Sequence, residues 1–290
     1  MQDVKAVFDA YQALRPKLPA MPAPGAGRQI GSLLDIAERA DAVVFDAFGV
    51  LNVGATPIPG AAERLRQLRA LGKAVRVLSN AASYDKPAAL DKFRRLGIPL
   101  TGAELITSRD ATLAAMDARL WGVIAAPEDA LCDLPGAWLR LDDSAEAHDR
   151  AEGFVFLSTA AWDETRQQRL AGSLAAQPRP VLIGNADLVA PRETGLTLEP
   201  GYYGHRLPGR PRFLGKPYAE VYALTRATLP GIAPGRIVMC GDTLHTDILG
   251  AAAEGWQTVL VTADGLFAGQ DTDPFERASG IVPDWRLARI

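Results

Sequence analysis

Short hydrophobic runs alternate with amphipathic stretches over much of the chain, and this pattern predicts parallel strands connected by helices. The continuous apolar run 42–45 is typical of a strand that is buried on both faces of a parallel sheet. In 61–71, Leu65 and Leu68 share one helical stripe, and 74–79 is the next apolar run. Strand, helix and strand in this order predict a βαβ unit whose ligand site lies beyond the carboxyl ends of its strands.

A second unit of the same kind follows near the end of the chain. The apolar runs 236–240 and 257–261 predict two strands, and the stretch near 246–254, which ends before Gly255, predicts the helix between them. The section that separates the two units is less regular. It predicts helices and strands in a mixed order, with helices at 86–96, 109–119 and about 162–175 and strands near 121–125, 153–157 and 180–184.

The interruption of one pattern by another predicts an α/β fold with two parts. A Rossmann-like core of parallel strands comprises 38–82 and 205–290, and an αβ domain is inserted at 83–204. Residues 4–15 have an amphipathic pattern, and a Pro- and Gly-rich stretch follows them. We therefore predict a separate N-terminal helix and arm over 1–37.

The composition limits the kinds of partner. The chain has 290 residues and a formal net charge of -3, which does not supply the dense basic surface that nucleic acid requires. No apolar stretch reaches the length of about 20 residues that a bilayer demands, and the acidic N-terminus differs from a secretory signal. Cys132 and Cys240 lie far apart and are predicted to be reduced. We expect a cytoplasmic protein that binds neither nucleic acid nor a membrane.

Polar residues follow both strands of the first unit. Asp46 ends the run 42–45, and Gly49 allows the backbone to turn sharply after it, so this carboxylate can act in a pocket as nucleophile and metal ligand. Ser79 and Asn80 end the next strand, where a hydroxyl, an amide and backbone N–H groups can hold phosphoryl oxygens. Each pattern alone also fits ordinary strand ends and turns.

Charged residues with matching chemistry occur later in the chain. Lys216, between Gly215 and Pro217, can neutralise a phosphate together with the nucleophile. Asp242 ends the strand 236–240 and Asp247 comes five residues later, and hard carboxylate oxygens of this kind suit Mg²⁺. An alternative for Asp247 is a favourable charge at the start of a helix.

Taken in order, these motifs resemble the haloacid dehalogenase superfamily, and within it the class IIA hydrolases. The order is an apolar strand to Asp-x-x-Gly, a strand to Ser-Asn, then Gly-Lys-Pro, then an apolar strand to Gly-Asp-x-x-x-Thr-Asp. The resemblance extends from about Asp41 to Gly265 and includes 58–61, 105–112 and 184–188. It implies that the inserted domain is the larger αβ (C2-type) cap. Family members often dimerise through this cap, and the sequence leaves open whether this protein forms such a homodimer.

The resemblance also implies a mechanism. The phosphoryl group of a small phosphorylated metabolite would pass in line to Asp46, and water would hydrolyse the aspartyl-phosphate. Mg²⁺ would be held by the carboxylates of Asp46 and Asp242 and the backbone carbonyl of Phe48, with Asp247 in support. The phosphoryl group would be bound by Ser79 and Asn80, and Lys216 would offset its charge. Positioning and electrostatics dominate such a reaction.

Phe48 departs from the family pattern, because most of these phosphatases carry a second aspartate two residues after the nucleophile. Phenylalanine cannot protonate a leaving group, and losing general acid/base help costs about 10²–10⁴-fold in rate. One hypothesis is a phosphatase that acts on substrates with good leaving groups or takes its acid/base group from the cap or the substrate. His205 is the first candidate for this group, and His245 is the second. A second hypothesis is a 2-haloacid-dehalogenase-like hydrolase, which Asp242 and Asp247 disfavour. The third is a catalytically weak protein that binds a phosphate ligand.

Substrate specificity is expected to come from the cap, because it closes over the part of the substrate that does not react. The polar candidates for this contact are Asn185, Asp187, Arg192 and His205. The aromatic candidates are Trp121, Trp162, Tyr202 and Tyr203, for which packing in a hydrophobic core is the alternative.

Overall fold

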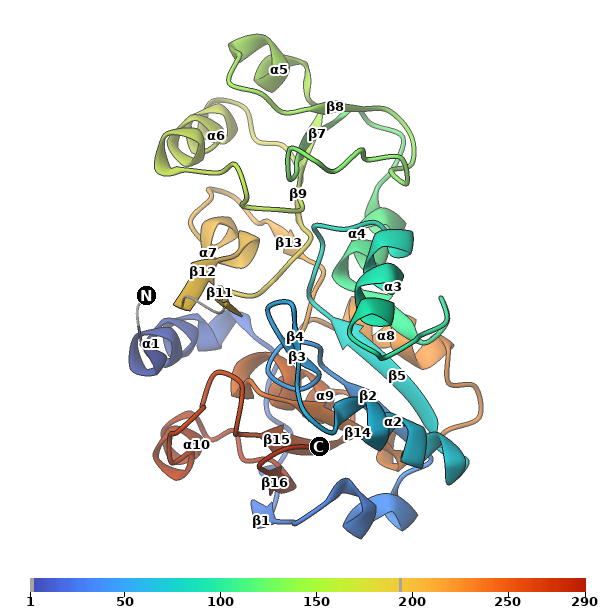
Figure 1. The fold of residues 1–290 in the computed structure, drawn as a ribbon. Coiled ribbons are helices and arrows are strands. Elements are labelled where there is room, and N and C mark those ends of the chain that lie inside the picture. The colour runs from blue at the N-terminus through green and yellow to red at the C-terminus, as the bar shows by residue number, and fades with distance from the viewer. Residues whose placement is uncertain (1–2, 193–194) are drawn as a thin grey trace.

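The computed structural model describes residues 3–192 and 195–290, except for the side chains of 191 and 192, and is built around two parallel sheets (Figure 1). The larger sheet has seven strands, and all of its pairs are parallel. Their spatial order is β1 (Arg28–Gln29), β16 (Trp285–Leu287), β15 (Gln257–Val261), β14 (Ile237–Gly241), β2 (Ala42–Phe45), β5 (Ala74–Ser79) and β6 (Leu105–Thr107). Because the strands are parallel, their carboxyl ends meet at one edge of the sheet.

Both faces of the larger sheet are covered, as continuous apolar strands predict. Val43 and Phe45 of β2 pack into one hydrophobic cluster, and Val44 packs into another on the opposite face. The helices of this part are α2 (Ala61–Ala70), α3 (Lys86–Arg95), α8 (Ala219–Ala227), α9 (Leu249–Ala253) and α10 (Asp273–Ser279). This part also has the 3₁₀-helical segments η2 (Leu33–Arg39) and η3 (Pro234–Arg236) and the π-helical turn η4 (Leu244–Ile248).

The smaller sheet has five parallel strands and lies above the larger one in Figure 1. Their spatial order is β13 (Arg212–Phe213), β10 (Val181–Ile183), β9 (Gly153–Phe156), β7 (Trp121–Ile124) and β8 (Trp138–Arg140). The helices between 108 and 204 are α4 (Ser108–Ala115), α5 (Ala145–Arg150), α6 (Glu164–Ala176) and α7 (Pro200–Gly204). Two hairpins complete the fold, β3 (Asn52–Val53) with β4 (Thr56–Pro57) and β11 (Val189–Arg192) with β12 (Gly195–Leu198).

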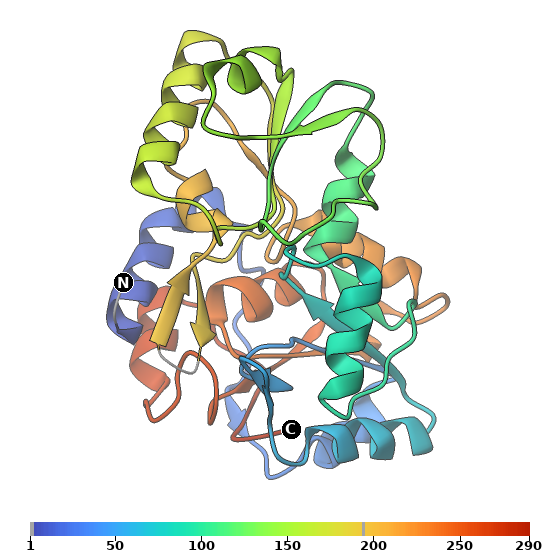
Figure 2. The same cartoon turned by 45° about the horizontal axis from the view of Figure 1, so that its top comes forward.

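The N-terminal helix α1 (Val4–Leu14), followed by the turn η1 (Arg15–Lys17), lies beside the β11–β12 hairpin (Figure 2). Its buried residues face two directions. Phe8 packs into a cluster of the larger-sheet part with Leu244 and Phe267, whereas Val7 and Tyr11 pack with residues of the loop and hairpin after β10. The helix therefore joins the two parts of the molecule, which the sequence pattern did not predict.

The two sheets divide the chain at other positions than the sequence predicts. β6 extends the larger sheet past residue 83, β13 belongs to the smaller sheet although it follows residue 204, and β1 brings part of the predicted arm into the larger sheet. These strands have two or three residues each, too few for a periodic signal. We propose to keep the division into core and cap, with borders between 107 and 121 and between 213 and 219.

Most of the predicted elements are present with small shifts. β5 and β15 coincide with the predicted strands, while β14 begins and ends one residue later. The predicted helix 109–119 ends early, because the backbone of Met116 is extended at φ −72° and ψ 140°. The helix predicted near 246–254 begins earlier, as the π-helical turn η4 that continues into α9. Among the described residues, no helix is both long and apolar enough to span a bilayer.

Candidate active site

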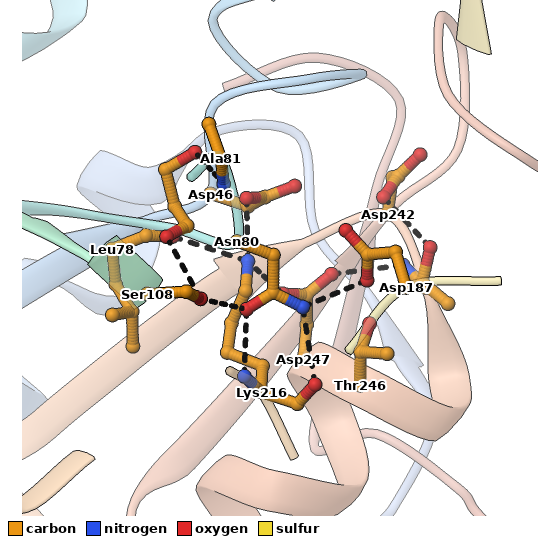
Figure 3. A network of polar contacts seen from close by, with 12 residues as sticks. Asp46, Leu78, Asn80, Ala81, Ser108, Asp187, Lys216, Asp242, Thr246 and Asp247 are labelled. Atoms are coloured by element: carbon orange, nitrogen blue, oxygen red, sulfur yellow. Dashed lines mark hydrogen bonds and ion pairs between the residues drawn. The ribbon is translucent and has the colours of Figure 1, made fainter. Parts of the chain in front are cut away.

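Lys216 lies at the centre of a buried ionic cluster at the carboxyl edge of the larger sheet (Figure 3). Its Nζ is 2.5 Å from Oδ1 of Asp46, which follows β2, and 2.7 Å from Oδ1 of Asp247 in η4. It also donates a hydrogen bond of 3.1 Å to the carbonyl of Leu78 in β5. Three segments far apart in sequence thus meet at one ammonium group, as the strand-end prediction required.

Asp242 follows β14 and completes a group of three carboxylates. One oxygen each of Asp46, Asp242 and Asp247 lies within 4.8 Å of the others. The carboxylate of Asp242 is fixed, since Oδ2 accepts from the backbone N–H of Leu266 at 2.7 Å. A Cβ atom at Gly49 would lie 2.4 Å from the same oxygen, so the turn after the first strand has to pass Asp242 without a side chain.

The electrostatics of the cluster favour a divalent cation. Burial raises the pKa of Asp46 to about 6 against the opposing charge of Lys216, and burial and the nearby Asp46 and Asp247 raise the pKa of Asp242 to about 8. Burial acts to lower the pKa of Lys216, but the carboxylates outweigh it and raise that pKa above its ordinary value. One ammonium cannot neutralise three carboxylates, and hard oxygens at this spacing fit a cation such as Mg²⁺.

Asn80 follows β5, and its side chain is fully engaged within the protein. The Nδ2 group donates to Oδ1 of Asp187 at 2.8 Å and to the backbone carbonyl of Lys216 at 3.1 Å. The Oδ1 atom accepts from the backbone N–H of Lys216 at 2.6 Å and from Oγ of Ser108 at 3.0 Å. These bonds give the Asn80 side chain a connecting role. Asn80 also lines the cavity described below, and its phosphoryl contact stays a prediction.

Ser79 remains placed for a phosphoryl contact. It is buried beside Asp46 at the edge of a cavity of about 90 Å³. Its Oγ accepts from the backbone N–H of Ala81 at 3.2 Å, so the hydroxyl hydrogen is directed elsewhere. Phe48 lines the same cavity, and its ring centroid lies 4.2 Å from Nζ of Lys92.

Two of the predicted cap residues, Asn185 and Asp187, line this cavity from the smaller-sheet side. Oδ1 of Asn185 accepts from the backbone N–H of Asp187 at 2.9 Å, and its Nδ2 donates to Glu199 at 3.0 Å. Burial is the largest effect on the carboxyl of Asp187 and raises its pKa well above the usual value. Glu199 and Tyr11 also line the cavity, although the sequence did not single them out.

The two candidate histidines lie elsewhere, which corrects the sequence-based hypothesis. The ring of His205 stacks on Phe213 at 4.1 Å, and burial lowers its pKa to about 4. The ring of His245 stacks on Tyr11 at 5.2 Å, its Nε2 is 2.8 Å from Oε1 of Gln12, and burial lowers its pKa to about 3. Neither is among the described residues that line the cavity.

Some of the aromatic candidates pack in hydrophobic clusters, and others line a cavity. Trp121 is 2% exposed and belongs to a hydrophobic cluster, so the core-packing alternative holds for it. Trp162 and Tyr203 line a neighbouring cavity of about 460 Å³. Tyr202 packs partly buried between α1 and the smaller sheet. The side chain of Arg192 falls outside the described residues.

Comparison with known proteins supports the sequence-based assignment. A family model for haloacid dehalogenase-like hydrolases matches residues 43–129, and a related HAD-hydrolase-like model matches 213–286. Human chronophin is 31% identical over 280 residues, which cover 89% of this chain and 94% of that protein. Human glycerol-3-phosphate phosphatase is 29% identical over 296 residues, covering 86% of this chain and 88% of that protein.

Solved structures share the fold of this chain. A possible sugar phosphatase of Cytophaga hutchinsonii has a TM-score of 0.80 at 24% identity and covers 91% of this chain and 98% of that one. A glycerol phosphate phosphatase of Mycobacterium tuberculosis, in complex with magnesium, has a TM-score of 0.65 at 22% identity, covering 79% and 70%. The chain, with its strand-end motifs and buried Asp–Lys cluster, therefore belongs to the haloacid dehalogenase-like hydrolases.

Proposed function

We propose that the protein is a Mg²⁺-dependent phosphomonoester phosphatase that acts on a small phosphorylated metabolite through an aspartyl-phosphate at Asp46. The observation that carries this proposal is the position of Lys216 between Asp46 and Asp247, with Asp242 completing the group. An ammonium beside the nucleophile can offset the charge of an incoming phosphoryl group. The names of the glycerol phosphate phosphatases among its relatives support the same class of reaction.

The residues of the chain have distinct parts in this proposal. Asp46 attacks phosphorus, Lys216 neutralises charge on the phosphoryl oxygens, and Ser79 donates a hydrogen bond to one of them. The cation would be held by Asp46, Asp242 and the backbone carbonyl of Phe48, with Asp247 in support. When bound, Mg²⁺ would supply further charge stabilisation to the phosphoryl group. The magnesium complex of the mycobacterial relative supports the choice of ion.

Two alternatives are less well supported. A dehalogenase of carbon–halogen bonds needs no divalent cation, so it gives no reason for three clustered carboxylates. A binding protein without activity gives no reason to keep a nucleophile paired with a lysine. Dimerisation through the cap and a cytoplasmic location remain predictions from the family resemblance and the composition.

The decisive experiment measures inorganic phosphate and halide release from phosphomonoesters and 2-haloacids, with Mg²⁺ or EDTA. Asp46→Asn serves as the blank, because it removes the nucleophile and keeps the volume of the side chain. The proposal expects phosphate release that depends on Mg²⁺ and disappears in the variant. Halide release without metal would establish the dehalogenase, and no release from any substrate would favour the binding protein.

A further inference from the structure

Phe48 leaves the proposed reaction without a side chain at its usual place to protonate the leaving group. Another group that can carry a proton therefore has to reach the cavity. Within the described chain, the groups that line the cavity and stand apart from the cluster around Lys216 are Tyr11, Tyr84, Asp187 and Glu199. Both histidines proposed from the sequence lie outside it.

Three of these four groups are poorly suited to the task. Both oxygens of Glu199 already accept hydrogen bonds, one from Asn185 at 3.0 Å and one from Thr197 at 3.1 Å. Burial raises the pKa of Tyr11 well above that of a free phenol. Tyr84, by contrast, is 50% exposed to solvent. A carboxyl group is also a much stronger acid than a phenol.

We propose that Asp187, supplied by the cap, is the proton carrier of the reaction in place of a side chain at position 48. Asp187 protonates the leaving group in the first step and takes a proton from water in the second. This inference rests on the phosphatase function proposed above. The sequence motifs alone do not distinguish this role of Asp187 from an ordinary contact to the substrate.

The position of Asp187 fits an in-line reaction. Asp46 belongs to the larger-sheet part and Asp187 to the loop after β10 of the smaller-sheet part, and both line the same cavity. In-line attack by Asp46 places the leaving oxygen on the far side of phosphorus, which is the cap side. Figure 3 shows the carboxyl of Asp187 beside Asn80, the residue next to the predicted phosphoryl ligand Ser79.

The backbone of Asp187 is fixed on both sides. Its own N–H donates to Oδ1 of Asn185 at 2.9 Å, and the N–H of Leu188 donates to the hydroxyl of Tyr11 at 3.1 Å. The Tyr11 ring in turn stacks on His245 of η4, with 8° between the ring planes. Contacts within the loop itself and from α1 and η4 thus hold the backbone that carries this carboxyl in place. Such fixed positioning is what proton transfer over a short distance requires.

The surroundings favour the protonated form of Asp187. Burial is the largest effect and raises its pKa, and the charges of Asp46 and Asp247 raise it further. Lys216 and the hydrogen bond from Asn80 oppose this rise but do not cancel it. The hydroxyl of Tyr11 is neutral and adds no charge. Because Asn80 bonds Oδ1, the proton is available on Oδ2.

The proton balance closes over the two steps. In the first, a bond forms between Asp46 and phosphorus while the bond to the leaving oxygen breaks, and Asp187 gives its proton to that oxygen. In the second, a water oxygen bonds to phosphorus while the Asp46–phosphorus bond breaks, and the Asp187 carboxylate accepts a proton from this water. The net reaction is hydrolysis, and Asp187 ends protonated as it began.

The test compares leaving groups in Asp187→Asn, which keeps the size of the side chain. Glycerol 3-phosphate needs protonation of an alkoxide, whereas p-nitrophenyl phosphate releases a stable anion. We expect turnover of the first to fall by about 10²-fold or more and turnover of the second by less than about tenfold. Asp143→Asn, which changes an exposed cap carboxylate paired with Arg166, is the matched control and should change both esters by the same factor.

A second variant tests the same idea if Asp187→Asn folds poorly. Asp187→Ala opens space beside Asn80, and added formic or acetic acid should restore turnover of the alkyl ester while leaving the nitrophenyl ester unchanged. Equal losses for both esters, or no rescue by the small acids, would overturn the proposal. Absence of turnover in the wild-type protein with every ester would instead reject the phosphatase function itself.

Discussion

The side-chain amide of Asn80 donates a hydrogen bond of 2.8 Å to Asp187, and this bond connects the two parts of the molecule at the cavity. Asn80 follows a strand of the larger sheet, and Asp187 follows a strand of the smaller one. The amide also fixes the backbone of Lys216 through two further bonds. Asn80 therefore holds the lysine and the cap loop in one arrangement.

Replacing Asn80 should separate these two roles. Asn80→Ala leaves the buried N–H of Lys216 without its acceptor, and an unsatisfied buried group costs about 1–3 kcal/mol. We expect a lower unfolding temperature and lower kcat/KM for all esters. Asn80→Asp keeps an acceptor but loses the donor to Asp187, so stability should suffer less than activity. Wild-type activity in Asn80→Asp would contradict the connecting role.

The acidic cluster predicts how stability depends on pH in the metal-free protein. The pKa values of Asp46 and Asp242 are raised to about 6 and about 8, against about 4 in an unfolded chain. The folded protein therefore binds more protons than the unfolded chain between these limits, and the free energy of unfolding falls as pH rises through this window. Thermal unfolding in EDTA should show the steepest fall in stability between about pH 4 and pH 6, where both groups contribute, and a slower further fall up to about pH 8, where Asp242 alone contributes.

Mg²⁺ should offset this loss, because it replaces protons on the same oxygens. The rise in unfolding temperature on adding Mg²⁺ is expected to be larger at about pH 8 than at about pH 5.5. Asp242→Asn should remove most of the pH dependence and weaken the response to Mg²⁺. Asp41→Asn, which removes an ion pair with Arg236 at the opposite end of β2 from Asp46, is the control. An unchanged response in Asp242→Asn would remove this residue from the cation site.

The neighbouring cavity predicts a preference among leaving groups. The catalytic cavity of about 90 Å³ has room for little more than a phosphoryl group, and it shares Ser83, Tyr84 and Glu199 with the cavity of about 460 Å³. The described lining of the larger cavity contains two carboxylates, Glu128 and Glu199, and no lysine, arginine or histidine. Neutral or cationic leaving groups should therefore be preferred to anionic ones.

Two esters of similar size test this preference. Glycerol 3-phosphate should have a kcat/KM about three- to tenfold above that of 3-phosphoglycerate, as expected for one charge near an exposed carboxylate, Glu128, and a buried one, Glu199. Glu128→Lys should reduce or invert the ratio. Asp91→Lys makes the same change of charge at a different cavity and should leave the ratio unchanged. The reverse result would place the leaving group at Asp91.

The sequence predicted the reactive side chains of the site better than the residues that hold them in place. Asp46, Ser79 and Asp242 come together because parallel strands end at one edge, a rule that needs no knowledge of side-chain packing. Lys216 was identified from its place between Gly215 and Pro217, and Asp187 through a family motif. Tyr11 could not be predicted, since its partner Leu188 is 177 residues away and only the docking of α1 brings them together. Asn80 was singled out in the sequence, but its connecting role could not be predicted, because its hydrogen-bond partners lie on three other segments.

Position 48 allows a last prediction, because Lys92 stands beside it. Nζ of Lys92 is 4.2 Å from the ring centroid of Phe48, so a carboxylate introduced there would have a cation as neighbour. A cation lowers the pKa of a carboxyl and keeps it ionised, which makes it a poor proton donor. In the Asp187→Asn background, Phe48→Asp alone should therefore restore little turnover of glycerol 3-phosphate.

Removing the positive charge of Lys92 should allow an aspartate at position 48 to donate a proton. Adding Lys92→Met to Phe48→Asp is expected to raise turnover of glycerol 3-phosphate by about tenfold or more, with a much smaller change for p-nitrophenyl phosphate. Lys92→Met without the new aspartate is the control and should give no gain. If Phe48→Asp alone restored full turnover, the charge of Lys92 would have no influence on position 48. If the pair restored none, an acid at this position would not reach the leaving group in this chain, and the cap would be the only side from which a proton can come.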